Sequence, residues 1–69
     1  MEITNIINLY DYFKDQTKYK PLNWSIAEDT IQFNKINYTD LINIIEIILN
    51  YFKINKMAYY NNYLMIQIK

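Results

Sequence analysis

The residues that could do chemistry in this chain of 69 residues are almost all carboxylates. Asp11 and Asp15 are four positions apart, so a helix would place them one turn apart, where they could share a divalent cation. Glu28 and Asp29 are adjacent, and the Ser25 hydroxyl lies shortly before them. A hard cation needs about six or more oxygen ligands, and a serine nucleophile needs a neighbouring base. We therefore interpret the first pair as a solvated helix face and the second group as a turn.

The residue types that are missing restrict the chemistry further. The sequence contains no histidine, cysteine, arginine or glycine. It therefore lacks the usual general base, the thiol nucleophile and the bidentate phosphate ligand, as well as the common ligands of zinc. Without glycine it cannot form the loops that bind phosphates or dinucleotides. We expect a protein that is not an enzyme and that uses no cofactor and no metal.

The composition indicates one small domain, residues 1–69, from an AT-rich genome. A single core of this size stabilises the fold by only a few kcal/mol, and the apolar share of 52% favours oligomerisation. Ile, Asn, Tyr, Lys and Phe fill 42 of the 69 positions, and their codons are rich in A and T. Low-GC bacteria, their phages and plasmids, and some large viruses have genomes of this kind.

The charge and the apolar stretches suggest a cytoplasmic protein, in the host cell if a phage encodes it. Seven lysines balance seven acids, which argues against a non-specific nucleic-acid ligand. Residues 21–50 carry four acids and one lysine, and residues 51–69 carry three lysines and no acid, which we interpret as ordinary solvated faces. No basic leader precedes an apolar segment, and the apolar stretch 41–54 is too short to span a bilayer. We expect no membrane association.

The first half of the chain reads as a helix followed by a hairpin. An apolar stripe formed by Ile3, Ile6, Ile7, Tyr10 and Phe13 predicts a helix over 3–15. Tyr12 is expected to point away from this stripe. Strict alternation then predicts a strand over 22–27 with three inward residues, Leu22, Trp24 and Ile26. A turn at Glu28–Asp29 leads to a second strand over 30–36, with Ile31 and Phe33 inward.

The second half reads as a long helix followed by another hairpin. Thr39 is the expected N-cap of a helix over 40–54, with Asp40 in its first turn. Residues 57–68 alternate, with Asn61–Asn62 as the turn and a shared face of Leu64, Ile66 and Ile68. The fold class is α+β, with an antiparallel sheet packed against two helices. The order is α-β-β-α-β-β, or α-β-β-α-β if residues 57–60 are only a connector.

Two groups of residues are candidates for binding a partner. The helix over 40–54 has one apolar stripe for the sheet, made by Leu41, Ile45, Ile48, Leu49 and Phe52. A second stripe lies beside Ile44 and consists of Ile47, Tyr51 and Ile54, which the first helix covers or a partner binds. The second group is a cluster of tyrosines at the C-terminal turn, formed by Tyr59, Tyr60 and Tyr63. These residues could form a protein interface or stack on unpaired bases, or they could reflect only the preference of tyrosine for strands.

We therefore expect a small interaction protein. The reading we favour is an inhibitor from a phage or mobile element that docks on a larger host protein complex, for example an anti-defence protein of the anti-CRISPR kind. One alternative is a nucleic-acid-binding accessory protein that uses the tyrosines with Lys53, Lys56 and Lys69. Another is a homo-oligomeric regulatory module of the antitoxin kind.

Overall fold

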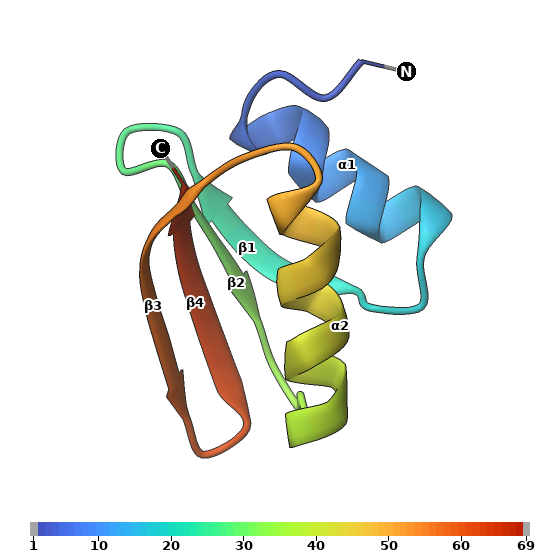
Figure 1. Ribbon diagram of the computed structural model, residues 1–69, viewed down its shortest axis with the longest axis vertical. Helices are drawn as coiled ribbons and strands as arrows, with labels where there is room; N and C mark the ends of the chain where they lie inside the picture. Colours follow the sequence, from blue (N-terminus) through green and yellow to red (C-terminus); the bar gives the residue numbers. More distant parts are fainter. Residues whose placement is uncertain (1, 69) are drawn as a thin grey trace.

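The computed structural model describes residues 2–68, which form two helices and four strands (Figure 1). In chain order these are α1 (Ile6–Gln16), β1 (Pro21–Ser25), β2 (Thr30–Phe33), α2 (Tyr38–Leu49), β3 (Ile54–Tyr60) and β4 (Tyr63–Ile68). The strands form one antiparallel sheet in the order β1-β2-β4-β3. The predicted α+β fold is confirmed, and the alternative with residues 57–60 as a connector is wrong. Neither helix within residues 2–68 has the length and apolar character needed to cross a bilayer.

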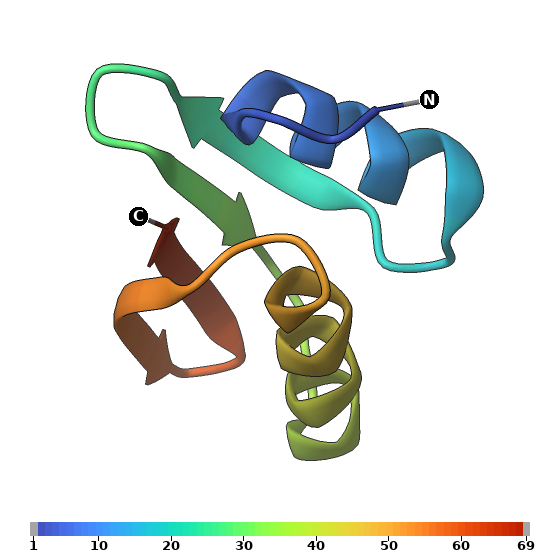
Figure 2. The same cartoon turned by 45° about the horizontal axis from the view of Figure 1, so that its top comes forward.

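Both helices lie on one face of the sheet, α1 against β1 and β2, and α2 beside the β3–β4 hairpin (Figure 2). The core lies between the helices and the sheet. The sheet side of the core is formed by alternate residues of β2 and β4. Ile31 pairs with Ile66 and Phe33 pairs with Leu64, and all four side chains are buried. The complete buried apolar set is Ile6, Leu9, Phe13, Ile31, Phe33, Ile36, Leu41, Ile44, Ile48, Leu64, Ile66 and Ile68.

Helix α1 begins at Ile6 and not at residue 3, because Asn5 caps it. The Asn5 side-chain oxygen accepts a hydrogen bond from the Asn8 backbone N–H at 2.9 Å. The predicted stripe omitted Leu9, which is fully buried, and three of its members are only partly buried: Ile3, Ile7 and Tyr10. Tyr12 does not point freely into solvent either, since its ring packs edge-on against Phe13 and Tyr51.

The expected inward face of β1 is largely wrong. Leu22 and Ile26 are each 55% exposed. The pairing register shifts between Pro21 and Asn23, which takes Leu22 out of the alternation, and Ile26 belongs to the turn that follows the strand. Trp24 alone faces inward as expected, with its ring centroid 6.4 Å from that of Tyr10 on α1.

Helix α2 is shifted and shortened relative to the prediction. Its N-cap is Asn37 and not Thr39, because the Asn37 side-chain oxygen accepts from the Asp40 N–H at 2.8 Å. Asp40 lies in the first turn as expected. The helix ends at Leu49 and not near residue 54, because Ile54 pairs with Ile68 at the start of β3 and the chain must leave the helix to reach it.

The turns use left-handed residues in a chain that has no glycine. Asn61 and Asn62 have φ values of 50° and 65°, which is the type I′ geometry that joins β3 to β4, and this predicted turn is confirmed. Lys35, between β2 and α2, has φ 58°. A side chain with a Cβ carries a steric penalty in this region, so Lys35 occupies an unfavourable backbone conformation.

The connection between β2 and α2 is held by the β3–β4 turn through Ile36. The Ile36 N–H donates to the Asn62 carbonyl at 2.8 Å. The Ile36 carbonyl accepts from the Tyr59 hydroxyl at 2.6 Å and from the Asn62 side-chain amide at 3.1 Å. These three hydrogen bonds place the first turn of α2 beside the tip of the second hairpin.

We expect Tyr59→Phe to lower the free energy of unfolding by about 1 kcal/mol, because it removes the part-buried hydroxyl that donates to the Ile36 carbonyl. Thermal unfolding should detect this as a fall in Tm of roughly 4–8 °C. Tyr60→Phe is the matched control, since Tyr60 is 75% exposed and should tolerate the change. Equal effects of the two substitutions would contradict the role given to the Tyr59 hydroxyl.

Lys35→Gly should raise the unfolding midpoint, because glycine adopts positive φ without the Cβ clash, which outweighs its entropic cost. The expected gain is below about 1 kcal/mol. Lys14→Gly, at an exposed position within α1, should lower stability by about 1 kcal/mol. Urea unfolding of both variants is the measurement, and midpoints that move in the same direction would contradict the prediction.

Candidate functional site

Large apolar side chains lie exposed along one side of α2. Their spacing of four, three and four residues places them within an arc of about 60° at 3.6 residues per turn: Tyr38, Ile42, Ile45 and Leu49. Three of them are between 44% and 68% exposed, and Ile45 is half-buried. The arc is centred roughly 100° away from the buried face of Leu41, Ile44 and Ile48. Helix α2 therefore has two apolar faces, of which the fold buries one.

The exposed face of α2 points away from α1. On the other side of the helix, the Asn43 side-chain amide donates to the Tyr19 hydroxyl at 2.8 Å, so that side faces the α1–β1 connection. Ile47 also lies on that side and packs against the core. The exposed stripe is consequently turned toward β3.

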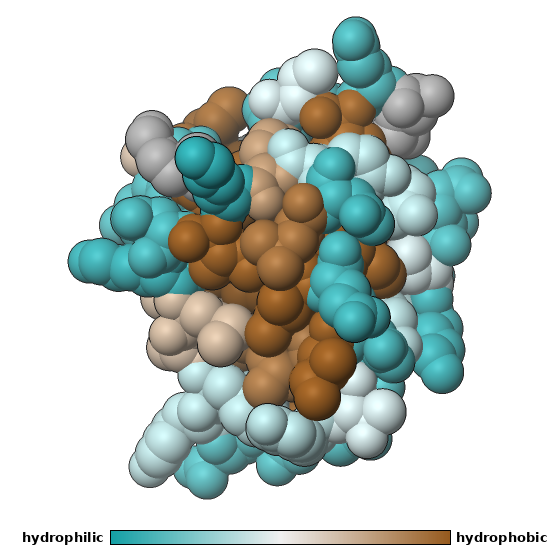
Figure 3. Space-filling model, in the orientation of Figure 1, coloured by the Kyte–Doolittle hydropathy of each residue, from teal (hydrophilic) through white to brown (hydrophobic). Residues whose placement is uncertain are grey.

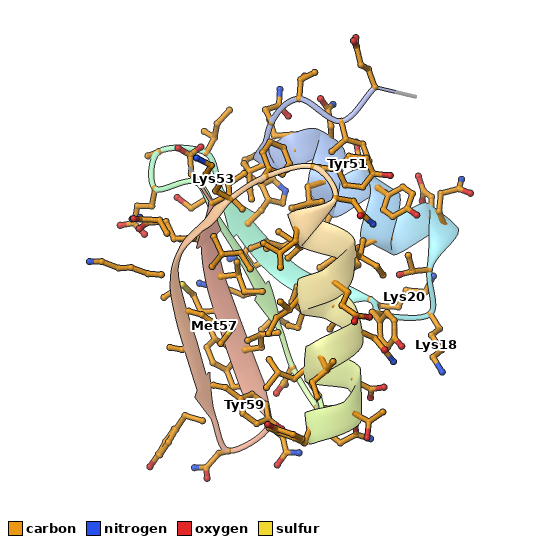
Figure 4. The ribbon with its side chains drawn as sticks, in the orientation of Figure 1. Lys18, Lys20, Tyr51, Lys53, Met57 and Tyr59 are labelled. Carbon is orange, nitrogen blue, oxygen red and sulfur yellow. The ribbon has the colours of Figure 1, made fainter. Side chains whose placement is uncertain are left out.

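Strand β3 extends the exposed stripe. Met57 pairs with the buried Ile66, so its side chain lies on the helix-bearing face of the sheet, where it is 46% exposed. Ile54, at the start of the same strand, is half-buried opposite Ile68 and packs against the core. Figure 3 shows that the apolar colouring continues from α2 across to β3, and Figure 4 shows Met57 on that side. We refer to the α2–β3 surface, which consists of Tyr38, Ile42, Ile45, Leu49, Ile54 and Met57.

The α2–β3 surface is uncharged and adjoins a free strand edge. None of its six residues is Asp, Glu or Lys, and Lys53 lies in the connection from α2 to β3, directly before Ile54. Strand β3 ends the sheet, so within the described chain it has a strand neighbour on one side only. The pair Tyr60–Tyr63 closes a two-residue turn and is hydrogen-bonded, and bonded pairs alternate with non-bonded ones along the ladder. The backbone N–H and C=O groups of Met57 and Tyr59 therefore point to the open edge.

The half of this edge formed by residues 57–60 lacks the devices that usually block strand addition, whereas Lys56 and a register irregularity lie in its first half. Residues 57–60 contain no proline and no charge, and the register irregularity of β3 lies before them, between Ile54 and Lys56. The opposite edge strand, β1, begins with Pro21 and has a register shift next to it. The two edges of the sheet therefore differ, and the open one lies beside the exposed apolar stripe.

The structure separates the residues of the predicted second helical stripe. Ile47 packs against the core, Tyr51 follows the end of α2, and Ile54 is in β3. The Tyr51 ring contacts the Tyr12 ring at 5.9 Å, with the two lining a shallow pocket on the side away from Met57 (Figure 4). Of the three, only Ile54 belongs to the α2–β3 surface, because the helix ends before the stripe can form.

The tyrosines of the C-terminal turn also lie on different faces of the sheet. Tyr59 faces the helices and donates to the Ile36 carbonyl, whereas Tyr60 and Tyr63 pair on the opposite face of the sheet. That face bears no helix within residues 2–68 and is mostly polar, with a single charged side chain among the residues that the strand register places there. The residues that the register places on this face are Asn23, Ser25, Thr30, Gln32, Lys56, Ala58, Tyr60, Tyr63, Met65 and Gln67. Lys56 is the one charged side chain among them.

The carboxylates form no centre in the part of the chain that the structure describes. Ser25 and Glu28 meet as a turn, because the Glu28 N–H donates to the Ser25 hydroxyl oxygen at 3.4 Å. Asp11 and Asp15 lie on α1, half-buried and exposed respectively. Within residues 2–68 no group of three or more potential metal-binding side chains is found.

Tyr38, Ile42 and Met57, which belong to the α2–β3 surface, were not predicted as binding residues from the sequence. The sequence prediction placed Ile45 and Leu49 on the buried stripe of the helix, although Leu49 is 56% exposed. The signal was present in the four-three-four spacing from Tyr38 to Leu49, which is typical of a helix seam that packs against a partner. It was hidden because an N-cap at Thr39 leaves Tyr38 outside the helix.

We expect Ile42→Asp to leave the fold intact and Ile44→Asp to unfold the chain, because Ile42 is 44% exposed and Ile44 is fully buried. Circular dichroism and urea unfolding should show a stability change of roughly 0.5 kcal/mol for Ile42→Asp, far smaller than the loss for Ile44→Asp. A cooperative loss of structure in Ile42→Asp under dilute conditions would show that Ile42 is part of the core.

Comparisons with protein-family models, with curated proteins and with solved structures gave no match to this chain. The features that mark a candidate functional site are an uncharged apolar stripe on α2, its continuation through Ile54 and Met57, and the open edge of β3.

Proposed function

We propose that this chain is a non-enzymatic interaction protein that binds another protein chain through the α2–β3 surface. The observation that carries the proposal is the contiguity of six uncharged apolar side chains beside a free strand edge. Single exposed apolar residues are common on monomeric proteins, but a continuous patch usually marks an interaction site.

The two parts of the surface would contribute differently to binding. The stripe on α2 offers apolar area whose burial supplies the binding free energy. The edge of β3 offers backbone groups of Met57 and Tyr59, which pair with an added strand and define its register. A partner that fits both presents an apolar helix or loop next to a strand with unpaired backbone groups.

A protein partner is favoured over a nucleic acid by charge. Single-stranded nucleic acids bind where aromatic side chains accompany a basic groove. The outer face of the sheet presents Tyr60 and Tyr63, yet Lys56 is the single ionised side chain placed there by the register of the described strands. The narrower expectation of a phage inhibitor that docks on a host complex rests on size and codon bias and stays a prediction.

The proposal is tested by affinity capture from a lysate of a low-GC bacterium, with the tagged chain as bait. A protein captured by the wild type should be lost with Ile42→Asp and Leu49→Asp, since each places a carboxylate in an apolar contact. Ile26→Asp is the matched control, because Ile26 is exposed and lies outside the α2–β3 surface.

A captured protein is then purified, and its binding to each variant is measured by calorimetry. Each carboxylate in the contact should weaken binding at least tenfold, equivalent to about 1.4 kcal/mol, while Ile26→Asp changes it less than twofold. If Ile42→Asp and Leu49→Asp associate with every partner, including a second copy of the chain, as tightly as the wild type does, the α2–β3 surface is not a binding surface.

A further inference from the structure

We infer that the occupant of the α2–β3 surface is a second copy of this chain, which adds its β3 antiparallel to β3 about a twofold axis at Ala58. This inference rests on the proposed function, because it uses the same surface and names the partner. The two sheets would join into one sheet of eight strands, with the α2 stripes of the two copies facing each other across their Met57 side chains.

The backbone of β3 is self-complementary in this register. With Ala58 opposite Ala58 of the second copy, Met57 lies opposite Tyr59, and Tyr59 lies opposite Met57. These are the residues whose N–H and C=O groups point to the open edge, so both positions become hydrogen-bonded pairs. Ala58 itself falls in a non-bonded pair on the outer face, where strands come closest and a small side chain fits.

The side chains agree with the same arrangement. On the helix-bearing face each Met57 meets the Tyr59 ring of the other copy, a favourable contact between sulfur and an aromatic ring. On the outer face each Lys56 lies opposite Tyr60, and the two copies of Lys56 are four residues apart along the strands, or roughly 13 Å. That separation exceeds the screening length of about 8 Å in physiological salt, so the lysines do not oppose pairing.

A second copy also satisfies what the surface requires of a partner. It brings an uncharged apolar stripe and an unpaired edge in the same relative position, because both are features of this fold. A stable interface buries about 800 Å² on each partner, which is below one-fifth of the 4536 Å² that the chain exposes. The outer face with Tyr60 and Tyr63 would stay uncovered in both copies.

Molecular mass in solution is the first measurement. Light scattering on the purified chain should give about 17 kDa, twice the 8.5 kDa of one chain, with dissociation on dilution. Ile42→Asp should give the monomer mass, and Ile26→Asp should keep the dimer. Met57→Pro should also give the monomer, because the Met57 N–H points to the open edge and its loss spares the β3–β4 ladder.

Cysteine substitution tests the register. The chain has no cysteine, so Ala58→Cys introduces a single thiol on the outer face. Across the proposed axis the two Cα atoms would be about 4.5 Å apart, within disulfide range, and mild oxidation should convert most of the protein into a covalent dimer. Lys56→Cys is the control, since its two copies would lie roughly 13 Å apart and should stay reduced.

Three results would overturn the inference: a monomer mass for the wild type up to high micromolar concentration, a dimer that survives both Ile42→Asp and Met57→Pro, or oxidation of Lys56→Cys as readily as Ala58→Cys. A strictly monomeric wild type that captures a lysate protein through Ile42 and Leu49 would reject the second copy and leave the proposed function standing. A monomer with no surface-dependent partner would reject both.

Discussion

The structure depends on the three hydrogen bonds that tie Ile36 to the second hairpin. Ile36 follows the last residues of β2 and directly precedes the N-cap of α2, and both of its backbone groups are bonded to Tyr59 or Asn62. A buried carbonyl that lost these donors would be left without partners in an apolar setting. The bonds therefore hold the residue directly before Asn37, whose side chain caps α2, and the position of this cap sets which residues each side of the helix presents.

That starting point has a direct consequence for the surface. With Asn37 as N-cap, Leu41, Ile44 and Ile48 enter the core, and Asn43 reaches the Tyr19 hydroxyl on the α1 side. The third side of the helix then contains Tyr38, Ile42, Ile45 and Leu49, and it faces away from α1. The same anchor that stabilises the fold thus leaves an apolar stripe uncovered beside an open strand edge.

Periodicity in the sequence predicted the element types and their order, because a period of two and a period of 3.6 are local properties. It also predicted the inward residues of β2 and β4 and the turn at Asn61–Asn62. It failed where tertiary contacts decide: Ile54 leaves the helix to pair with Ile68, and Leu22 leaves the alternation at an irregularity of register. The candidate site was misplaced for the same reason, since the stripe of Ile47, Tyr51 and Ile54 requires a helix that continues past Leu49.

An AT-rich codon bias would account for how many isoleucines and tyrosines this chain contains, but not for where they lie. A bias that acts on every position alike would scatter exposed apolar residues over the surface, as Leu22 and Ile26 are on the far side of the sheet from β3. The exposed residues Tyr38, Ile42, Leu49 and Met57 instead lie together in the α2–β3 surface. This surface adjoins the edge of β3, where residues 57–60 include neither a proline nor a charged side chain. A small domain gains little net stability from its own core, so a continuous apolar surface at an open edge is a liability unless another chain covers it. Composition therefore does not account for the position of this surface beside β3, whereas the proposed role in binding does.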